Sequence, residues 1–366
     1  MRSLHLLWGL GYLLACEPAP LGVNDPTEEE EPETPELKPE SILAVDLSAL
    51  PQIEASAAQF YTASGAPLDM LPFLKEMGLN TVRLRLWVHP ENQHSGFEEV
   101  EAFAQRIHSA GLQLWLTVHY SDTWADPGQQ IIPDAWAGMA YPIVKDSLLR
   151  YTEKVIASMQ PDILQLGNEI NSGWVHPIGD RHAQQDQFLD LLGSAAQVVR
   201  NSSPETQILL HFAGLEGAEA FFAEVEEVDY DLIGLSYYPL WHGKDLAGLK
   251  TTLQTLGETY NKGVLIAETA YPFTLDWADH TNNIVGLAEQ LILPSYPATP
   301  QGQKDFMRVI RSLTTQEVAM GRGYCYWGGE LIAWKGPEAT DGSPWENQAL
   351  FDFEGQALPV WEVFLP

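Results

Sequence analysis

The sequence predicts a (β/α)8 barrel that forms a single domain over residues 41–366. Eight apolar runs rich in β-branched residues are spread along this range, and most are separated by segments with helical periodicity. No linker and no change of composition divides the range. The alternative is an open doubly wound sheet, but no GxGxxG motif follows the first run. Eight strand–helix units therefore favour a closed barrel, with its active site at the carboxyl ends of the strands.

The predicted elements alternate along the chain. The eight predicted strands begin at Ile42, Thr81, Leu112, Ile163, Gln207, Leu232, Val264 and Gly323. Between the second and third, residues 97–111 place apolar side chains at helical spacing and end in Gly111, as helices commonly do. Residues 144–159 are a second long helical segment.

Two of the predicted strands end in a glutamate. ILQLGNEIN (163–171) delivers Glu169 and VLIAETAYP (264–272) delivers Glu268. An ionised carboxylate is costly to remove from water unless it is paired or hydrogen-bonded. A single glutamate in this position fits a solvated strand cap as well as it fits a site. Two such carboxylates at one end of a barrel predict acid/base chemistry.

Other strands also end in polar or aromatic residues. The remaining candidate site residues are Asp46, Arg83, Arg85, Trp87, His119, Asp122, Trp124, Asn168, Tyr238 and Trp327. Arg83 and Arg85 share one face of a strand because side chains alternate with a period of two. A guanidinium beside a carboxylate keeps that carboxylate ionised. Tyr238 and Trp327 would each also suit the core, so the prediction depends on the convergence of many such residues.

The first residues have the pattern of an export signal. Arg2 precedes an apolar stretch from Leu4 to Leu14, which is too short to span a bilayer, and Leu13-Leu14-Ala15-Cys16 resembles a bacterial lipobox. We therefore expect residues 1–15 to be a signal peptide and Cys16 to be lipidated. An ordinary secretory signal or a short anchor is the alternative. After cleavage at Cys16, Cys325 would be the only other thiol, so no intrachain disulfide is expected in the mature chain.

Residues 16–40 are predicted to be an acidic tether. Residues 17–40 hold nine acidic residues, one lysine and several prolines, and they lack the apolar side chains that a core requires. The whole chain has a net charge of −31, and the predicted domain is also acidic. Such a surface repels nucleic acid and anionic polymers and favours a neutral ligand. We expect a monomer outside the cytoplasm, lipid-anchored in the bacterial outer membrane or at the cell surface.

Six motifs make the sequence resemble a known family. They are NTVRLRLWVHP (80–90), HYSDTWADPG (119–128), LGNEI with SGWVHPIG (166–179), GLSYYPLW (234–241), IAETAYP (266–272) and NQALFDFEGQALP (347–359). In this order they resemble glycoside hydrolase family 53, the endo-β-1,4-galactanases, which belong to a clan of retaining (β/α)8 glycosidases. The resemblance implies that Glu169 is the acid/base and Glu268 the nucleophile. It also implies that Asn168 holds the sugar 2-hydroxyl and that Arg83 and His119 support the nucleophile.

A retaining mechanism makes specific demands on these residues. It needs two carboxyl groups about 5 to 5.5 Å apart, one protonated and one ionised, so their environments must separate their pKa values. Arg83 or Arg85 would keep Glu268 ionised, while Glu169 in a drier setting would keep its proton. Sugar rings would stack on the indoles of Trp87, Trp124 and Trp327. Sugar hydroxyls would meet Asp46, Asp122 and Tyr238.

The expected reaction requires neither a metal nor another cofactor. The sequence contains no HExxH motif and no EF-hand loop, although a structural Ca2+ in a long loop, as some bacterial relatives have, is left open. The expected substrate is a neutral polysaccharide, β-1,4-galactan in pectic side chains.

The chain departs from the family pattern at two places near the expected groove. Many members have Trp-Glu-Pro-Ala-Trp after the eighth strand, whereas this chain has WGGELIAW at 327–334 and a rebuilt loop after it. Many members also have Trp in the loop after the fourth strand, where this chain has His176. The number of subsites and the product length therefore stay open.

Two other functions also fit the sequence. One is a related retaining β-glycanase acting on a glycan such as mannan, which would carry the same Asn168, Glu169 and Glu268. The other is a surface glycan-binding lipoprotein that has lost catalysis, although the presence of both glutamates, Asn168 and Arg83 argues against it.

Overall fold

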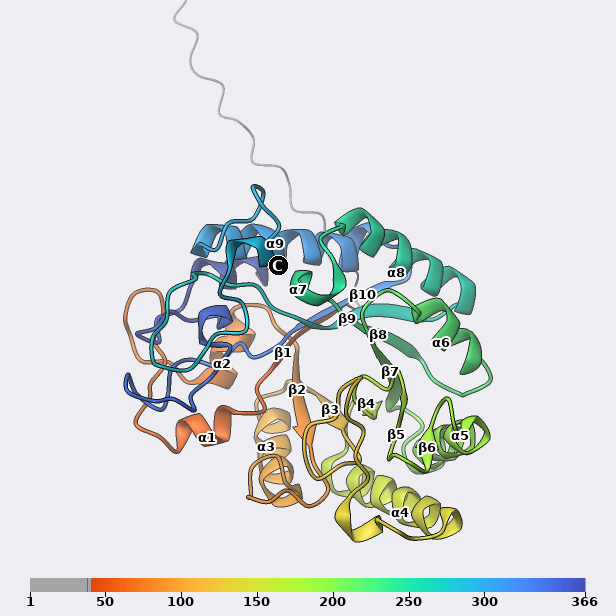
Figure 1. The fold of residues 1–366 in the computed structure, drawn as a ribbon. Coiled ribbons are helices and arrows are strands. Elements are labelled where there is room, and N and C mark those ends of the chain that lie inside the picture. The colour runs from red at the N-terminus through yellow and green to blue at the C-terminus, as the bar shows by residue number, and fades with distance from the viewer. Residues whose placement is uncertain (1–37, 39–40, 366) are drawn as a thin grey trace, which may run out of the picture. The chain divides into compact units, whose positions relative to one another are not determined.

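A computed structural model describes residue 38 and residues 41–365. The expected signal peptide, the lipidation site Cys16 and all but Lys38 of the expected tether lie outside the described residues. Eight parallel strands form a closed barrel in the order β1-β10-β9-β8-β7-β4-β3-β2 (Figure 1). The strands are β1 (Ile42–Asp46), β2 (Thr81–Leu86), β3 (Gln113–Val118), β4 (Ile163–Leu166), β7 (Gln207–Ala213), β8 (Leu232–Ser236), β9 (Gly263–Thr269) and β10 (Gly321–Tyr326). The predicted (β/α)8 barrel is thus confirmed.

Helices surround this barrel (Figure 1). They are α1 (Leu50–Glu54), α2 (Met70–Glu76), α3 (Phe97–Ser109), α4 (Tyr141–Met159), α5 (Gln185–Ser202), α6 (Ala218–Glu224), α7 (Pro239–His242), α8 (Leu246–Tyr260) and α9 (Pro300–Ser312). The two helices predicted from periodicity correspond to α3 and α4. A short hairpin of β5 (Gly173–Trp174) and β6 (Gly179–Asp180) follows β4. Within the described part of the chain, none of the helices is long and apolar enough to cross a bilayer.

The alternation of side chains along each strand divides the core in two. Side chains between the strands and the helices form the larger apolar cluster. A smaller cluster fills the inside of the barrel, with Ile42, Ala44, Trp115, Ile163, Leu209, Leu232, Leu265, Ala267 and Cys325. Continuing the period of two from these residues toward the carboxyl ends reaches Asp46, Thr117, Gln165 and His211, which are buried and polar. The barrel interior therefore changes from apolar to polar just below its mouth.

A register shift between β8 and β9 directs the side chain of Glu268 toward the mouth of the barrel. The pairing of β8 with β9 passes from Leu235 opposite Ile266 to Ser236 opposite Glu268, which leaves Ala267 as an extra residue. An extra residue of this kind changes which side chains face inward. Ala267 remains in the inner cluster, and the next side chain, Glu268, lines the cavity at the mouth.

Candidate active site

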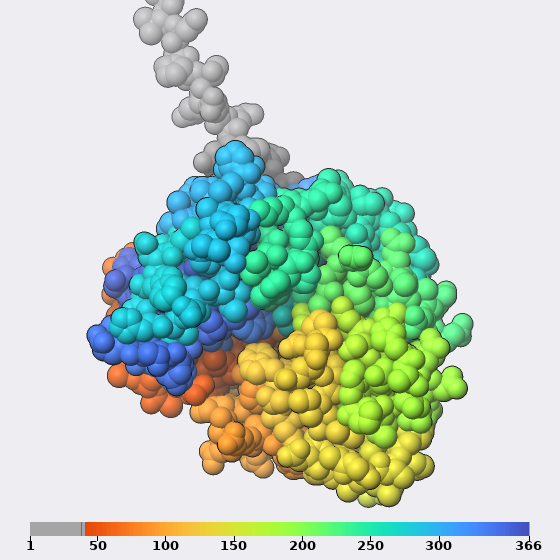
Figure 2. Space-filling view, in the orientation of Figure 1, coloured from red at the N-terminus to blue at the C-terminus, as the bar shows by residue number. Residues whose placement is uncertain are grey.

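A cavity of about 470 Å³ lies at the carboxyl ends of the strands. Figure 2 shows this hollowed face, between loops of the C-terminal part in blue and loops of the N-terminal half in orange to yellow. Ten of the predicted site residues line the cavity: Asp46, Arg83, Arg85, His119, Trp124, Asn168, Glu169, Tyr238, Glu268 and Trp327. The structure thus brings both glutamates into one cavity of the size that a small ligand fills.

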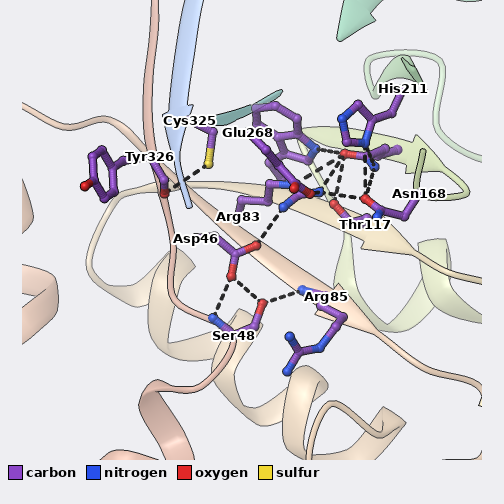
Figure 3. A network of polar contacts seen from close by, with 12 residues as sticks. Asp46, Ser48, Arg83, Arg85, Thr117, Asn168, His211, Glu268, Cys325 and Tyr326 are labelled. Carbon is purple, nitrogen blue, oxygen red and sulfur yellow. Dashed lines mark hydrogen bonds and ion pairs between the residues drawn. The ribbon is translucent and has the colours of Figure 1, made fainter. Parts of the chain in front are cut away.

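Arg83 is the centre of the polar network at the floor of this cavity (Figure 3). Its guanidinium donates to Asp46 Oδ2 at 2.9 Å, to Glu268 Oε1 at 2.7 Å and to Asn168 Oδ1 at 3.0 Å. The side chain is only 2% exposed. Burial lowers the pKa of Arg83, but the negative charges of Glu268 and Asp46 outweigh this effect and raise it. Arg83 is therefore a fixed positive charge that holds three side chains from three strand ends.

Glu268 is held by both of its oxygens. Arg83 binds Oε1, and the Tyr238 hydroxyl donates to Oε2 at 3.2 Å. Burial raises the pKa of Glu268, and the charge and hydrogen bond of Arg83 oppose this rise. Burial and the nearby carboxylates also raise the pKa of Tyr238, so its hydroxyl keeps the proton that it donates. Because a cation contacts it directly, Glu268 is the carboxyl of the pair that ionises first.

Glu169 lies in a different environment in the same cavity. The Ser236 hydroxyl donates to its Oε1 at 2.5 Å. Burial raises the pKa of Glu169 to about 8, and the charge of Glu268 adds to the rise. Its backbone has a φ of 47°, two residues after Gly167 with a φ of 77°. A Cβ on Gly167 would lie 2.5 Å from Ile170 Cγ2, so the turn that presents Glu169 requires glycine there.

A buried chain of hydrogen bonds through Ser236, His211 and Gln165 connects Glu169 to Arg83, which donates to Gln165 Oε1 at 3.4 Å. His211 Nε2 lies 2.9 Å from Ser236 Oγ, and the Gln165 amide lies 3.0 Å from His211 Nδ1. Burial and the charge of Arg83 lower the pKa of His211 well below its usual range, so the ring is neutral. Since Ser236 donates to Glu169, the ring proton lies on Nε2 and Nδ1 accepts from Gln165. Sequence reasoning missed Gln165, His211 and Ser236. The alternation of side chains along their strands could have identified them, because each lies two residues beyond an inward-facing position.

His119 and Asn168 both fix the loop after β3. His119 Nδ1 accepts from the Ala125 backbone N–H at 3.1 Å, and the Asn168 amide donates to the Ala125 carbonyl at 2.9 Å. Burial and the charges of Arg85 and Arg83 lower the pKa of His119 far below its usual range. The ring is therefore neutral, and its Nε2–H remains available as a donor.

Three predicted residues lie differently from the expectation. Asp122 is not part of the cavity lining, because its oxygens accept from the backbone N–H groups of His89 at 2.8 Å and Asp134 at 2.9 Å. Asp46 does line the cavity, but its carboxylate is occupied by Ser48 and Arg83. Trp87 lines a second, neighbouring cavity. Sequence reasoning did not identify Trp241 or His242, which line the cavity from the short helix α7.

No metal centre is apparent in the part of the chain that the structure describes. Among residues 38 and 41–365, no group of three or more His, Cys, Asp or Glu side chains is arranged to hold a metal ion.

Known proteins resemble this chain in sequence and in fold. The family model described as Glycosyl hydrolase family 53 matches residues 42–364. An arabinogalactan endo-β-1,4-galactanase of Cellvibrio japonicus is 34% identical, over 88% of this chain and 90% of that protein. An endo-β-1,4-galactanase of Bacillus subtilis is 30% identical, over 88% and 85%. The solved GH53 catalytic domain of Ignisphaera aggregans is 35% identical, with a TM-score of 0.85 over 90% of this chain and 97% of that one. With a match across the whole barrel and two glutamates at its mouth, the chain belongs to glycosyl hydrolase family 53.

Proposed function

We propose that this protein is a retaining endo-β-1,4-galactanase that uses Glu268 as nucleophile and Glu169 as acid/base. The observation that carries the proposal is that the two carboxyl groups lie in one cavity but in different environments. Glu268 accepts from Arg83 and Tyr238, whereas burial raises the pKa of Glu169 to about 8. A double displacement needs one ionised and one protonated carboxyl group of this kind.

In the first step, Glu268 Oε2 or Oε1 attacks the anomeric carbon while Glu169 gives its proton to the departing glycosidic oxygen. The bond to the leaving sugar breaks and a glycosyl-enzyme ester forms. In the second step, Glu169, now ionised, takes a proton from water, which attacks the same carbon and releases Glu268. Arg83 holds Glu268 in position through both steps, and Asn168, fixed by Arg83 and Ala125, offers its remaining amide N–H to the sugar.

Internal β-1,4-galactosidic bonds are the proposed target. The relatives named above that carry an activity in their names are galactanases. The net charge of −31 disfavours an anionic polymer as substrate. Indoles of Trp124, Trp327 and Trp345 line the cavity and suit the apolar faces of galactose. The reaction uses no cofactor, and we propose that the protein acts as a monomer.

A reducing-sugar assay on galactan, arabinogalactan and mannan tests the substrate. Release from galactan and arabinogalactan with none from mannan supports the proposal, while release from mannan alone identifies a related β-glycanase. No release from any of them, together with retained binding, would indicate a glycan-binding protein. Early 1H NMR spectra of the product give the stereochemistry: the β-anomer must appear first, and an α-anomer would contradict the double displacement.

We also propose that the protein is exported and anchored through a lipid on Cys16, in the outer membrane or at the cell surface. The basis is the sequence of residues 1–16 alone: a basic residue, an apolar stretch and Leu-Leu-Ala-Cys. A polymeric substrate is consistent with an enzyme outside the cytoplasm.

A further inference from the structure

A second cavity of about 420 Å³ continues the active-site cavity on one side. Asp46, Arg85, Trp124, Trp327 and Trp345 line both, so the two cavities are parts of one groove. Neither Glu169 nor Glu268 lines the second cavity. It therefore receives a part of the ligand that is remote from the bond being cleaved.

The rebuilt loop after β10 forms one wall of this second cavity. Gly328 has a φ of 70°, and a Cβ on Gly329 would lie 2.7 Å from Val45 Cγ2. The Gly329 carbonyl accepts from Leu350 N–H at 2.9 Å. Only glycine suits this sharp turn against β1. The turn brings the next residue, Glu330, back over the end of β1, where its Oε1 accepts from Ala49 N–H at 2.9 Å.

The other oxygen of Glu330 has no partner. The residue is 1% exposed, and among the described residues nothing hydrogen-bonds to Oε2. Burial, helped by the charge of Asp46, raises the pKa of Glu330 to about 8, so the group is a protonated acid at neutral pH. Trp87 Nε1, on the same cavity, is a second buried polar atom without a partner. Because Glu330 and Trp87 line the same cavity, a ligand lying there is the candidate partner for both atoms.

The position of Glu169 decides which part of the glycan enters this cavity. Glu169 follows β4, and the leaving sugar must lie beside it because it receives its proton. The second cavity is bounded by the ends of β1, β2 and β10; β10 lies opposite β4 in the barrel, and neither β1 nor β2 is a neighbour of β4. It therefore lies on the glycone side, where the sugars that remain attached to the nucleophile extend.

We propose that Glu330 is a specificity-determining residue of a distal glycone subsite, where its carboxyl group hydrogen-bonds a hydroxyl of a neutral β-linked hexose. Trp334 and Trp327, which line the same cavity, supply apolar faces for the ring. This inference rests on the proposed function. It assigns a role to the Gly-Gly-Glu sequence that sets the rebuilt loop apart from the common family pattern.

Kinetics on short and long substrates test the proposal. An activated aryl β-galactoside fills only the sugar position at Glu268, whereas β-1,4-galactotetraose reaches the second cavity. Glu330→Ala should lower kcat/KM for the tetraose by about tenfold, mainly through KM, and leave the aryl galactoside unchanged. Glu330→Gln should stay within about threefold of the wild type on both, because its amide can accept from Ala49 and still donate to the ligand. Glu227→Ala, at an exposed position outside the groove, is the matched control.

Two results would overturn the proposal. Equal losses on both substrates with a lower melting temperature would assign Glu330 a structural role. Unchanged kinetics of Glu330→Ala on both would show that the carboxyl group does not contact the ligand. Failure of the proposed function looks different, because the wild type itself would then not hydrolyse galactan. If it hydrolyses mannan instead, the same comparison on short and long mannosides tests the subsite.

Discussion

Arg83 Nη2 lies 2.7 Å from Glu268 Oε1 and 3.0 Å from Asn168 Oδ1, so a single nitrogen of one guanidinium fixes the proposed nucleophile and the residue before the proposed acid/base. The same guanidinium binds Asp46 through its other terminal nitrogen. Asp46, Asn168 and Glu268 come from the ends of three different strands. One buried side chain thus links Glu268 to the residue that precedes Glu169.

Replacing Arg83 should damage both stability and activity. Arg83→Met leaves Asp46 and Glu268 buried without their cation, which we expect to cost about 3–5 kcal/mol of unfolding free energy. Arg83→Lys keeps the positive charge but lacks the planar set of donors. It should therefore be more stable than Arg83→Met and still lose most of its kcat. Urea unfolding and galactan hydrolysis measure the two effects. The control is Arg106→Met, which removes an exposed ion pair with Glu54 and should cost less than about 1 kcal/mol. Equal costs for both variants would contradict the central role of Arg83.

The roles of the two glutamates can be separated by azide rescue. Removal of either should lower kcat by several orders of magnitude. In Glu268→Ala, azide attacks an activated β-galactoside once and gives the α-galactosyl azide. In Glu169→Ala the nucleophile survives, so azide intercepts the glycosyl-enzyme and gives the β-azide. The anomers are distinguished by NMR, and a β-azide from Glu268→Ala would reverse the assignment.

The pH profile should report the proton on Glu169. Because the acid form is required for the first step and its pKa in the free protein is raised to about 8, kcat/KM should fall as pH rises through about 8. The hydrogen bond from Ser236 lowers the pKa of Glu169. Ser236→Ala should therefore move the falling limb to higher pH. Ser312→Ala is the control, because Ser312 donates to Glu317 and neither residue lines the cavity; it should leave the falling limb at the same pH. A limb that stays fixed or moves to lower pH in Ser236→Ala would contradict the role of this bond.

Trp334 and Trp345 should respond differently to truncation. Trp345 packs against Trp327, Tyr238 and Trp241 with ring centroids 4.3, 5.4 and 6.1 Å away, so it is part of the cavity wall. Trp345→Ala should lower the melting temperature as well as activity. Trp334 lines the second cavity and not the active-site cavity. Trp334→Ala should therefore change which oligosaccharides accumulate and have little effect on the melting temperature. Chromatography of the products and thermal unfolding decide this; a lower melting temperature with an unchanged product pattern for Trp334→Ala would make it a packing residue.

Membrane fractionation tests the expected lipid anchor. Cys16→Ser should release the protein from membranes without changing its specific activity, because the lipid is attached far from the barrel in sequence. Cys325→Ser is the control: this thiol is buried inside the barrel, and the variant should stay membrane-bound. A wild-type protein that is soluble and cleaved elsewhere would exclude lipidation.

The sequence predicted strand ends far better than it predicted loops. Strand periodicity placed Arg83 and Arg85 on one face, and both line the cavity. Asp122 was misleading because a carboxylate in a loop can cap backbone N–H groups as easily as it can face a ligand. Trp241 and His242 were missed because they lie in the short helix α7, whose placement over the cavity no local period encodes. The register shift that turns Glu268 inward comes from pairing between strands and was not visible in its own motif.

The apolar cluster inside the barrel limits how water and protons can reach the carboxyl groups. Trp115 lies beneath Arg83, with the guanidinium carbon 5.6 Å from the ring centroid, and its Nε1 donates to Gln165 at 3.1 Å. Below it the interior is filled by Ile42, Ala44 and Cys325. Water and protons therefore have no route to the carboxyl groups through the barrel axis. A glycan lying across the mouth would cover the cavity from its open side, so we expect the water that completes each turnover to arrive after the leaving sugar has moved away.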